Sequence, residues 1–270
     1  MNVLKRKLCL GIGDILYSKA MLDSVKDEYD EIYISPDWAI FEEYCSERGQ
    51  PYMDFIRFLF GRLFSDKPYI LSNEQSFEMI SALHTGNFKL VKPDIRKYFT
   101  KERVFNFPYV VVTTKVRGTP KYLFKNLEEL FVETLTNLSK KYNIVLLGER
   151  LVGMNKEYKI HGSNIIYSIY DSVRYLPNVL DLTAYNELGM ASPTQIDFCR
   201  DLNTMAHSVA TIAIGCGGNF CLASAIANTI AYSVHGDGEL VLNALYRDKE
   251  DPTVSVDIDP QKFCDRIANL

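Results

Sequence analysis

The chain has 270 residues, 47% of them hydrophobic and 24% charged, a composition typical of a globular protein with a sizeable core. Its net charge of −4 argues against a nucleic-acid partner, because such proteins usually carry a basic excess that neutralises phosphates. No stretch reaches the roughly 18 apolar residues of a membrane span, and the run Leu8 to Ile12 is too short for a signal peptide.

The first part of the chain alternates predicted strands and helices. A strand is expected over Lys7 to Ile12, an apolar-patterned helix follows to about Lys26, and a second strand runs from Glu31 to Ser35. This β-α-β order is the unit from which parallel sheets are built. The aromatic-rich stretch from Trp38 to Phe64 favours a helix, and Tyr69 to Ser72 favours a short strand.

A second unit with the same rhythm begins near residue 105. Its first segment, Tyr109 to Thr114, is continuously β-branched or apolar and predicts a strand covered on both faces. Apolar spacing predicts helices over 127–138, from about 201 and over 260–269, and strands over 143–147, 165–170, 179–182, 211–214 and 229–234. We therefore expect an α/β fold of two doubly wound domains, residues 1–105 and 106–270.

Polar or glycine-rich turns follow several predicted strands. In open parallel sheets, ligands bind outside the carboxyl ends of the strands, so turns that converge there indicate a site. The turns are Gly11–Asp14, Lys115–Gly118, Gly148–Arg150, Gly215–Asn219 and His235–Gly238. In the last of them, His235 lies beside Asp237 and is a candidate substrate contact, with an ordinary loop histidine as the alternative.

The run Gly215-Cys216-Gly217-Gly218-Asn219 is the strongest of these turns. Glycines let the backbone approach a ligand closely, and unpaired N–H groups at the start of a helix attract phosphate. We therefore take Gly217, Gly218 and Asn219 as candidate diphosphate contacts. The alternative is a tight turn that packs a small-residue helix on the sheet. The run has neither the lysine nor the glycine spacing of the known nucleotide-binding fingerprints.

Charged residues follow the first two strands of the second unit. Lys115 and Arg117 could neutralise a diphosphate, although both could equally be surface charges of a solvated loop. Glu149 ends an apolar strand, where a carboxylate can accept hydrogen bonds from ribose hydroxyls. Alternatively, Glu149 pairs with the neighbouring Arg150 or caps a turn.

Asp14 stands at the first strand end of the N-terminal unit. A carboxylate at that position can act as general base on an acceptor hydroxyl. Aspartate is also a favoured helix N-cap, and the two roles are compatible.

No metal or other cofactor is expected. None of the predicted strands is followed by Asp-x-Asp, and the sequence shows no clustered carboxylates and no His-x-x-x-His. Its six cysteines lack the spacing of a zinc site, and free thiols are expected in a cytoplasmic protein.

The chain resembles glycosyltransferases of the GT-B class, and within them the heptosyltransferase-like branch. Three segments carry the resemblance: Leu10 to Leu16 with its Gly-Asp turn, Thr113 to Lys115 before a long helix, and Met205 to Ala223 with its glycine turn. The last turn reads Gly-Gly-Asn where the branch typically has Asp-Thr-Gly or Asn-Ser-Gly. The sugar and the acceptor are therefore not carried over.

The resemblance implies two Rossmann-like domains that face each other across a cleft. It implies a metal-independent, inverting transfer of a sugar from a UDP- or GDP-type donor to a glycan or other hydroxyl acceptor, with Asp14 as base and Glu149 on the ribose. The alternatives are a nucleotide-sugar epimerase or hydrolase on the same fold, and a non-catalytic nucleotide-binding or scaffold protein.

Overall fold

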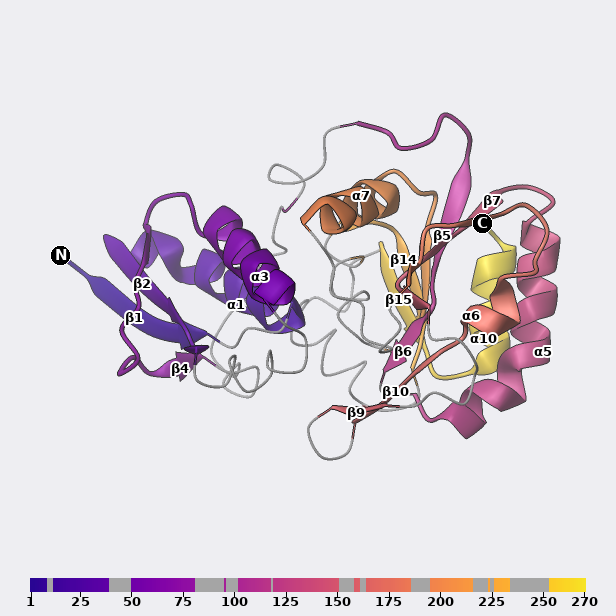
Figure 1. The fold of residues 1–270 in the computed structure, drawn as a ribbon, viewed down its shortest axis with the longest axis horizontal. Coiled ribbons are helices and arrows are strands. Elements are labelled where there is room, and N and C mark those ends of the chain that lie inside the picture. The colour runs from indigo at the N-terminus through magenta and orange to yellow at the C-terminus, as the bar shows by residue number, and fades with distance from the viewer. Residues whose placement is uncertain are drawn as a thin grey trace.

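The computed structural model describes residues 1–8, 12–38, 50–80, 95, 102–117, 119–150, 158–160, 164–185, 195–215, 223, 226–233 and 253–270. Two parallel sheets organise them into two α/β units, which Figure 1 shows side by side. Among the described helices, none combines the length and apolarity of a membrane span.

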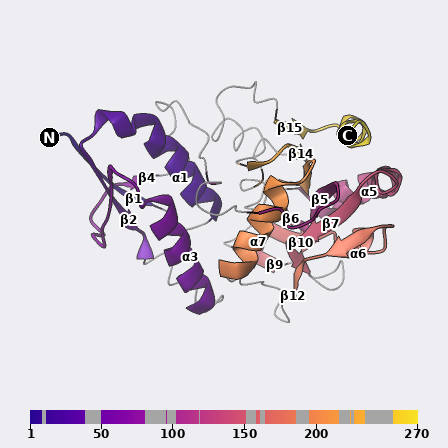
Figure 2. The same ribbon diagram turned by 90° about the horizontal axis from the view of Figure 1, so that it is seen from above.

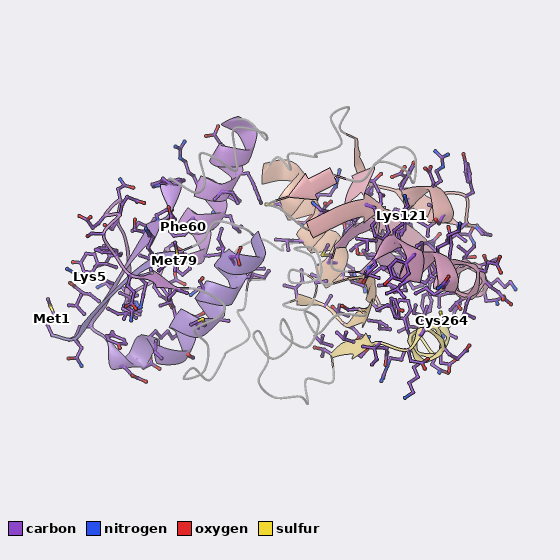
Figure 3. The ribbon with its side chains drawn as sticks, turned by 90° about the horizontal axis from the view of Figure 1, so that it is seen from below. Met1, Lys5, Phe60, Met79, Lys121 and Cys264 are labelled. Carbon is purple, nitrogen blue, oxygen red and sulfur yellow. The ribbon has the colours of Figure 1, made fainter. Side chains whose placement is uncertain are left out.

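The N-terminal unit is built on a four-stranded parallel sheet in the order β3-β2-β1-β4. Its strands are β1 (Val3–Leu8), β2 (Glu31–Pro36), β3 (Tyr69–Leu71) and β4 (Met79–Ile80). Helix α1 (Ile12–Val25) connects β1 to β2 and continues into the short 3-10 helix η1 (Lys26–Glu28), and α3 (Gln50–Leu63) precedes β3. Apolar side chains of both helices pack on the sheet, among them Phe60 of α3, which is labelled in Figure 3.

The C-terminal unit is built on a six-stranded parallel sheet in the order β11-β7-β5-β13-β14-β15. Its strands are β5 (Tyr109–Thr113), β7 (Asn143–Leu147), β11 (Val179–Asp181), β13 (Thr211–Ile214), β14 (Thr229–Tyr232) and β15 (Val254–Asp257). Strand β5, the first of this unit along the chain, lies in the middle of the sheet next to β13, the fourth. The strands after β5 are added toward one edge of the sheet and those from β13 onward toward the other, so the order of addition reverses between β5 and β13.

Helices cover both faces of the six-stranded sheet, because its strands are apolar on both sides. Val110 and Val112 of β5 belong to a buried cluster with helices α5 (Lys121–Leu138) and α10 (Pro260–Ala268). Tyr109 and Val111, which alternate with them, belong to a second cluster with α7 (Gln195–Ala206). This alternation is the period of a strand, and it produces a doubly wound α/β sheet.

The second cluster also contains the core of the N-terminal unit. Ile32 of β2, Leu59 of α3 and Met205 of α7 are members of the same set of buried apolar side chains. The expected boundary at residues 105 and 106 falls between the last strand of one sheet and the first strand of the other.

Short strands extend the C-terminal unit beyond its main sheet. An antiparallel sheet of β6 (Lys115–Arg117), β10 (Asn164–Ser168) and β9 (Tyr158–Ile160) follows β5, and α6 (Tyr170–Val173) follows β10. A parallel pair, β8 (Glu149–Arg150) with β12 (Ala184–Tyr185), continues from β7 and β11. The expected loops at residues 115–118 and 148–150 are therefore partly strand, which corrects the sequence interpretation.

The first strand begins four residues earlier than expected and ends before the glycine turn. The basic run Lys5 to Lys7 makes the start of this strand polar in sequence, but in the structure Lys5 and Lys7 contact aromatic rings and a carboxylate. The Lys5 ammonium lies 5.9 Å from the ring centroids of both Tyr33 and Phe77. The Lys7 ammonium lies 3.4 Å from the Asp37 carboxylate. Long basic side chains can thus occupy strand positions while their apolar stems pack.

Candidate functional site

The carboxyl ends of β5 and β13 form the position in this fold where a ligand crevice is expected. In doubly wound sheets, the loops that follow the two strands on either side of the reversal run to opposite faces and leave room between them. Here the strands end at Thr113 and Ile214. Both threonines of the Thr113-Thr114 pair are buried. The candidate site is this edge of the six-stranded sheet.

Thr114 connects the end of β5 to the end of the neighbouring β7. Its backbone N–H donates to the Leu147 carbonyl at 2.8 Å, and its hydroxyl donates to the same oxygen at 3.1 Å. The Thr113 hydroxyl lies on the other side, 3.5 Å from the Ile212 carbonyl of β13. The two threonines therefore fix the backbone from which the next residues leave the sheet.

Two strands leave this edge through glycines in the left-handed region. Gly148 follows β7 with a φ of 105°, and Gly215 follows β13 with a φ of 79°. An L side chain is strained in that region, so both positions favour glycine. The Gly215 N–H donates to the Tyr232 carbonyl at 2.6 Å, which fixes where the predicted phosphate turn begins.

Lys115 and Arg117, the two candidate phosphate cations, lie on β6. Their backbones pair with Ser168 and Ile166 of β10, so both residues leave the sheet edge on an ordered strand. The Lys115 side chain is half-buried, and Val116 between the two is fully buried. The solvated-loop alternative is therefore wrong for the backbone, while diphosphate binding by these cations stays a prediction.

Glu149, the candidate ribose contact, lies on β8 directly after Gly148. Its backbone pairs in parallel with Ala184 of β12. The hydrogen bond from Thr114 to Leu147 joins the ends of the neighbouring strands β5 and β7. Lys115 and Glu149, which follow these two strands, therefore lie at adjacent strand ends. The structure brings these two predicted positions to one edge, together with Gly215.

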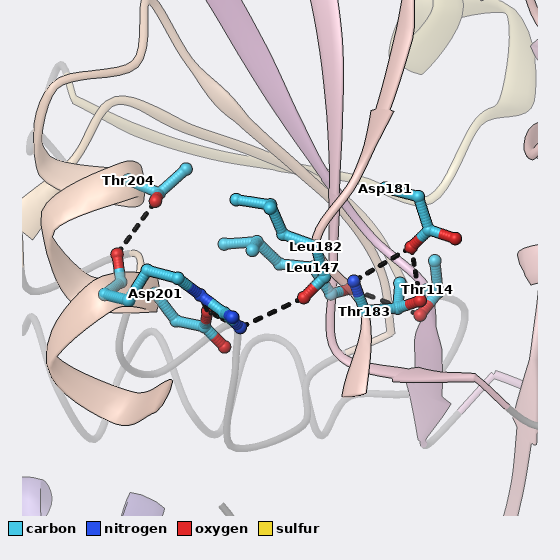
Figure 4. A network of polar contacts seen from close by, with 8 residues as sticks. Thr114, Leu147, Asp181, Leu182, Thr183, Asp201 and Thr204 are labelled. Atoms are coloured by element: carbon cyan, nitrogen blue, oxygen red, sulfur yellow. Dashed lines mark hydrogen bonds and ion pairs between the residues drawn. The ribbon is translucent and has the colours of Figure 1, made fainter. Parts of the chain in front are cut away.

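A polar network at the same edge was missed by the sequence interpretation. Asp181, the last residue of β11, accepts hydrogen bonds from the Tyr170 hydroxyl at 2.7 Å, the Thr183 N–H at 2.9 Å and the Thr183 hydroxyl at 2.5 Å. Arg200 of α7 donates to the Leu182 carbonyl at 3.1 Å. Figure 4 shows Asp181, Leu182 and Thr183 of this network beside Thr114 and Leu147.

The signal that could have found Asp181 is its place at a strand end, the same signal that selected Glu149. Arg200 had no such signal, because it lies within α7 and its contact with this edge is to a backbone carbonyl, which a sequence pattern cannot locate. The bonds to Asp181 and Leu182 hold the chain in an ordered path as it leaves β11. They make this edge a well-defined polar surface.

Asp14 belongs to the N-terminal unit, where the corresponding reversal lies between β1 and β4. The structure places it as the third residue of α1, exposed to solvent, rather than at the N-cap. A carboxylate in the first helical turn is stabilised by the helix dipole. Figures 1 and 2 show the start of α1 on the side of its unit nearer the six-stranded sheet. Its role as general base stays a prediction.

The remaining candidates, Gly217, Gly218, Asn219 and His235, lie outside the described residues. Within the described part of the chain, no group of three or more His, Cys, Asp or Glu residues is arranged to hold a metal ion.

Burial raises the pKa of Tyr232, whose backbone carbonyl accepts the hydrogen bond from the Gly215 N–H. A smaller contribution to the raised pKa comes from the charge of Asp259.

No protein-family model matches the chain, and no curated protein matches it. Solved structures that resemble it include the iron-containing dodecameric heptosyltransferase TibC in complex with ADP-D-β-D-heptose, at 13% identity and a TM-score of 0.43, covering 90% of this chain and 60% of that one. TibC from enterotoxigenic E. coli H10407 matches at 14% identity and a TM-score of 0.45, covering 86% and 57%. E. coli ADP-heptose LPS heptosyltransferase II matches at 11% identity and a TM-score of 0.44, covering 100% and 98%.

The chain thus spans about 60% of the length of the TibC chains. Heptosyltransferases, the branch whose motifs the sequence resembles, are among the structures that match the fold.

Proposed function

We propose that the chain is a glycosyltransferase that moves a sugar from a nucleotide-diphosphate donor to an acceptor hydroxyl. In this proposal the two units face each other across a cleft, as in GT-B enzymes. The donor lies at the carboxyl edge of the six-stranded sheet, and the acceptor lies beside α1. The reaction is metal-independent and inverting, and its location is the cytoplasm.

One observation carries the proposal: the same strand order, third-second-first-fourth, occurs in both sheets. Each unit therefore has a reversal point at which a ligand can bind. In the C-terminal unit this point is flanked by Thr113 and Gly215, followed by Lys115 on one side and by the predicted phosphate turn on the other. In the N-terminal unit, α1 leaves β1 with the Asp14 carboxylate in its first turn.

The residues have separate roles in this reaction. Lys115, Arg117 and the N–H groups of Gly217 to Asn219 bind the diphosphate and stabilise its charge as it departs. Glu149 accepts hydrogen bonds from the ribose, and His235 contacts the donor. Asp14 takes the proton of the acceptor hydroxyl as its oxygen attacks the anomeric carbon, and the bond to the diphosphate breaks.

Donor binding is tested by thermal unfolding with ADP, UDP, GDP and their sugar conjugates, and with AMP and NAD as comparisons. ADP belongs in the panel because TibC was solved with an ADP-linked heptose. A ligand at 100 times its Kd stabilises the folded state by about 2.7 kcal/mol. One nucleoside diphosphate is expected to raise the Tm. Indifference to every diphosphate would support a scaffold and sink the proposal.

The diphosphate site is tested with Lys115→Ala against Lys125→Ala, a control on the exposed face of α5. Loss of one charge-assisted hydrogen bond weakens binding by about 1.5–3 kcal/mol, roughly 10- to 150-fold. Calorimetric titration with the stabilising diphosphate should show that loss for Lys115→Ala alone. Equal affinities of the two variants would remove Lys115 from the site.

The base is tested with Asp14→Asn against Asp27→Asn, a control in the exposed η1. Removal of a general base typically lowers the rate by about 10²- to 10⁴-fold, while donor binding at the other unit is retained. Full transfer by Asp14→Asn would disprove the assignment. Consumption of the donor without any acceptor would indicate a hydrolase instead.

A further inference from the structure

A buried ion pair on α1 has no place in the donor and acceptor contacts described above. The Lys19 ammonium lies 2.6 Å from Oδ1 of Asp23, and the Tyr69 hydroxyl donates to that same oxygen at 2.7 Å. The side chains of Lys19 and Asp23 are 6% and 15% exposed. The ammonium also lies 4.3 Å from the Tyr69 ring centroid and 5.6 Å from that of Phe64. The group therefore links α1 to β3 and to the end of α3.

The surroundings of α1 explain why such a directional contact matters. Residues 18–22 are all buried, and five consecutive residues span more than one full helical turn. The middle of α1 is therefore enclosed on every side, mostly by apolar contacts. Such contacts are non-directional, so they limit a small rotation of the helix about its axis only through packing. A hydrogen-bonded ion pair limits the rotation more tightly, because its geometry must be kept once it is out of water.

Asp14 lies on the same helix, five residues before Lys19, about 7.5 Å along the axis. A rotation of α1 by about 20° would move an atom at the outer radius of the helix, roughly 5–6 Å from its axis, by about 2 Å. A misplacement of about 1 Å at a reacting group can cost on the order of 100-fold in rate. The proposed reaction therefore requires that the rotation of α1 about its axis is fixed.

We propose that Lys19, Asp23 and Tyr69 are positioning residues that fix the rotation of α1 and thereby direct the Asp14 carboxylate toward the acceptor. This inference rests on the proposed function. The three residues do not touch substrate. Their contribution is specific orientation rather than stability, because buried ion pairs can often be replaced by apolar residues without loss of stability.

The experiment compares Lys19→Met/Asp23→Leu, which removes both charges and places apolar side chains at the two positions, with Arg57→Gln/Asp54→Asn. The latter pair is a matched control on α3, with side chains 53% and 63% exposed. The first double variant is expected to unfold at a Tm close to that of the unchanged chain. Its kcat is expected to fall at least 10-fold, while KM and Kd for the donor are unchanged. The control pair keeps the full kcat.

A folded Lys19→Met/Asp23→Leu chain with kcat within twofold of the unchanged chain would overturn the inference. If that variant does not fold, Tyr69→Phe decides, because it removes a single hydroxyl from the group. A several-fold lower kcat with unchanged donor KM supports positioning, and full kcat overturns it. Failure of the proposed function is distinguishable, because the unchanged chain would then transfer no sugar, whereas failure of the inference leaves transfer by the unchanged chain intact.

Discussion

Gly215 has a backbone conformation that residues with a side chain rarely adopt, whereas Gly61 lies in an ordinary helix and serves as a comparison. Gly215→Ala should destabilise the fold by about 1–2 kcal/mol, because its φ of 79° is in the left-handed region. Gly61 lies inside α3 with nothing within 4 Å of an added Cβ, so Gly61→Ala should stabilise by about 0.5–1 kcal/mol. Urea unfolding measures both. The same sign for the two changes would contradict the explanation.

Tyr109 makes stability depend on alkaline pH. Burial, opposed by a smaller effect of Arg103, raises its pKa to about 12, while an unfolded tyrosine titrates near 10. The neutral phenol therefore stabilises the fold fully below pH 10, and that stabilisation is lost as the pH rises toward 12. The slope is about 1.4 kcal/mol per pH unit. Unfolding measured at pH 9 and 11 should show a steeper loss for the unchanged chain than for Tyr109→Phe, and equal slopes would contradict it.

At the scale of elements, α10 is held in place by its N-cap. The Asp259 carboxylate accepts a hydrogen bond from the Lys262 N–H at 3.0 Å, and Pro260 opens the helix. Asp259→Ala should cost about 1 kcal/mol, whereas Asp259→Asn keeps an acceptor and should cost a few tenths at most. Thermal unfolding of the two variants tests the cap. Because Phe263 and Ile267 of α10 cover the sheet, a loosened cap should also speed hydrogen exchange in β14.

The elements that sequence patterns predicted are those with continuous apolar cores, such as β5, β7 and β13. Strand β15 was missed because Val254–Asp257 is half-buried at the sheet edge and alternates with polar residues. Strands β6 and β8 were missed because their pairing partners are distant in sequence. For the site, the pattern located the strand ends of Lys115, Glu149 and Gly215. Asp181 carried the same strand-end signal, but its contact with Tyr170 and the contact of Arg200 with Leu182 depend on where α6 and α7 pack, which the pattern does not give.

At the scale of the molecule, the shared buried cluster predicts that the two units unfold together. Trp38, the single tryptophan, follows β2 and reports on the N-terminal unit. Leu127 of α5 lies on the far face of the six-stranded sheet, and Leu127→Ala should cost about 2–5 kcal/mol. Trp38 fluorescence and far-ultraviolet circular dichroism should therefore shift to the same lower midpoint in urea. An unshifted Trp38 transition would show that the units unfold independently.

The pairing of β5 with β13 has a consequence for how the protein is made. Val111 pairs with Thr211, so partners 100 residues apart in sequence meet at the centre of the sheet. During synthesis, one edge of the apolar strand β5 stays open until residues 211–214 have left the ribosome. Long-range pairing of this kind is slow, and an open apolar edge can associate with other chains. The pairing of β5 with β13 at the candidate site therefore leaves an apolar strand edge open while about 100 residues are synthesised, and during that interval the nascent chain can associate with other chains.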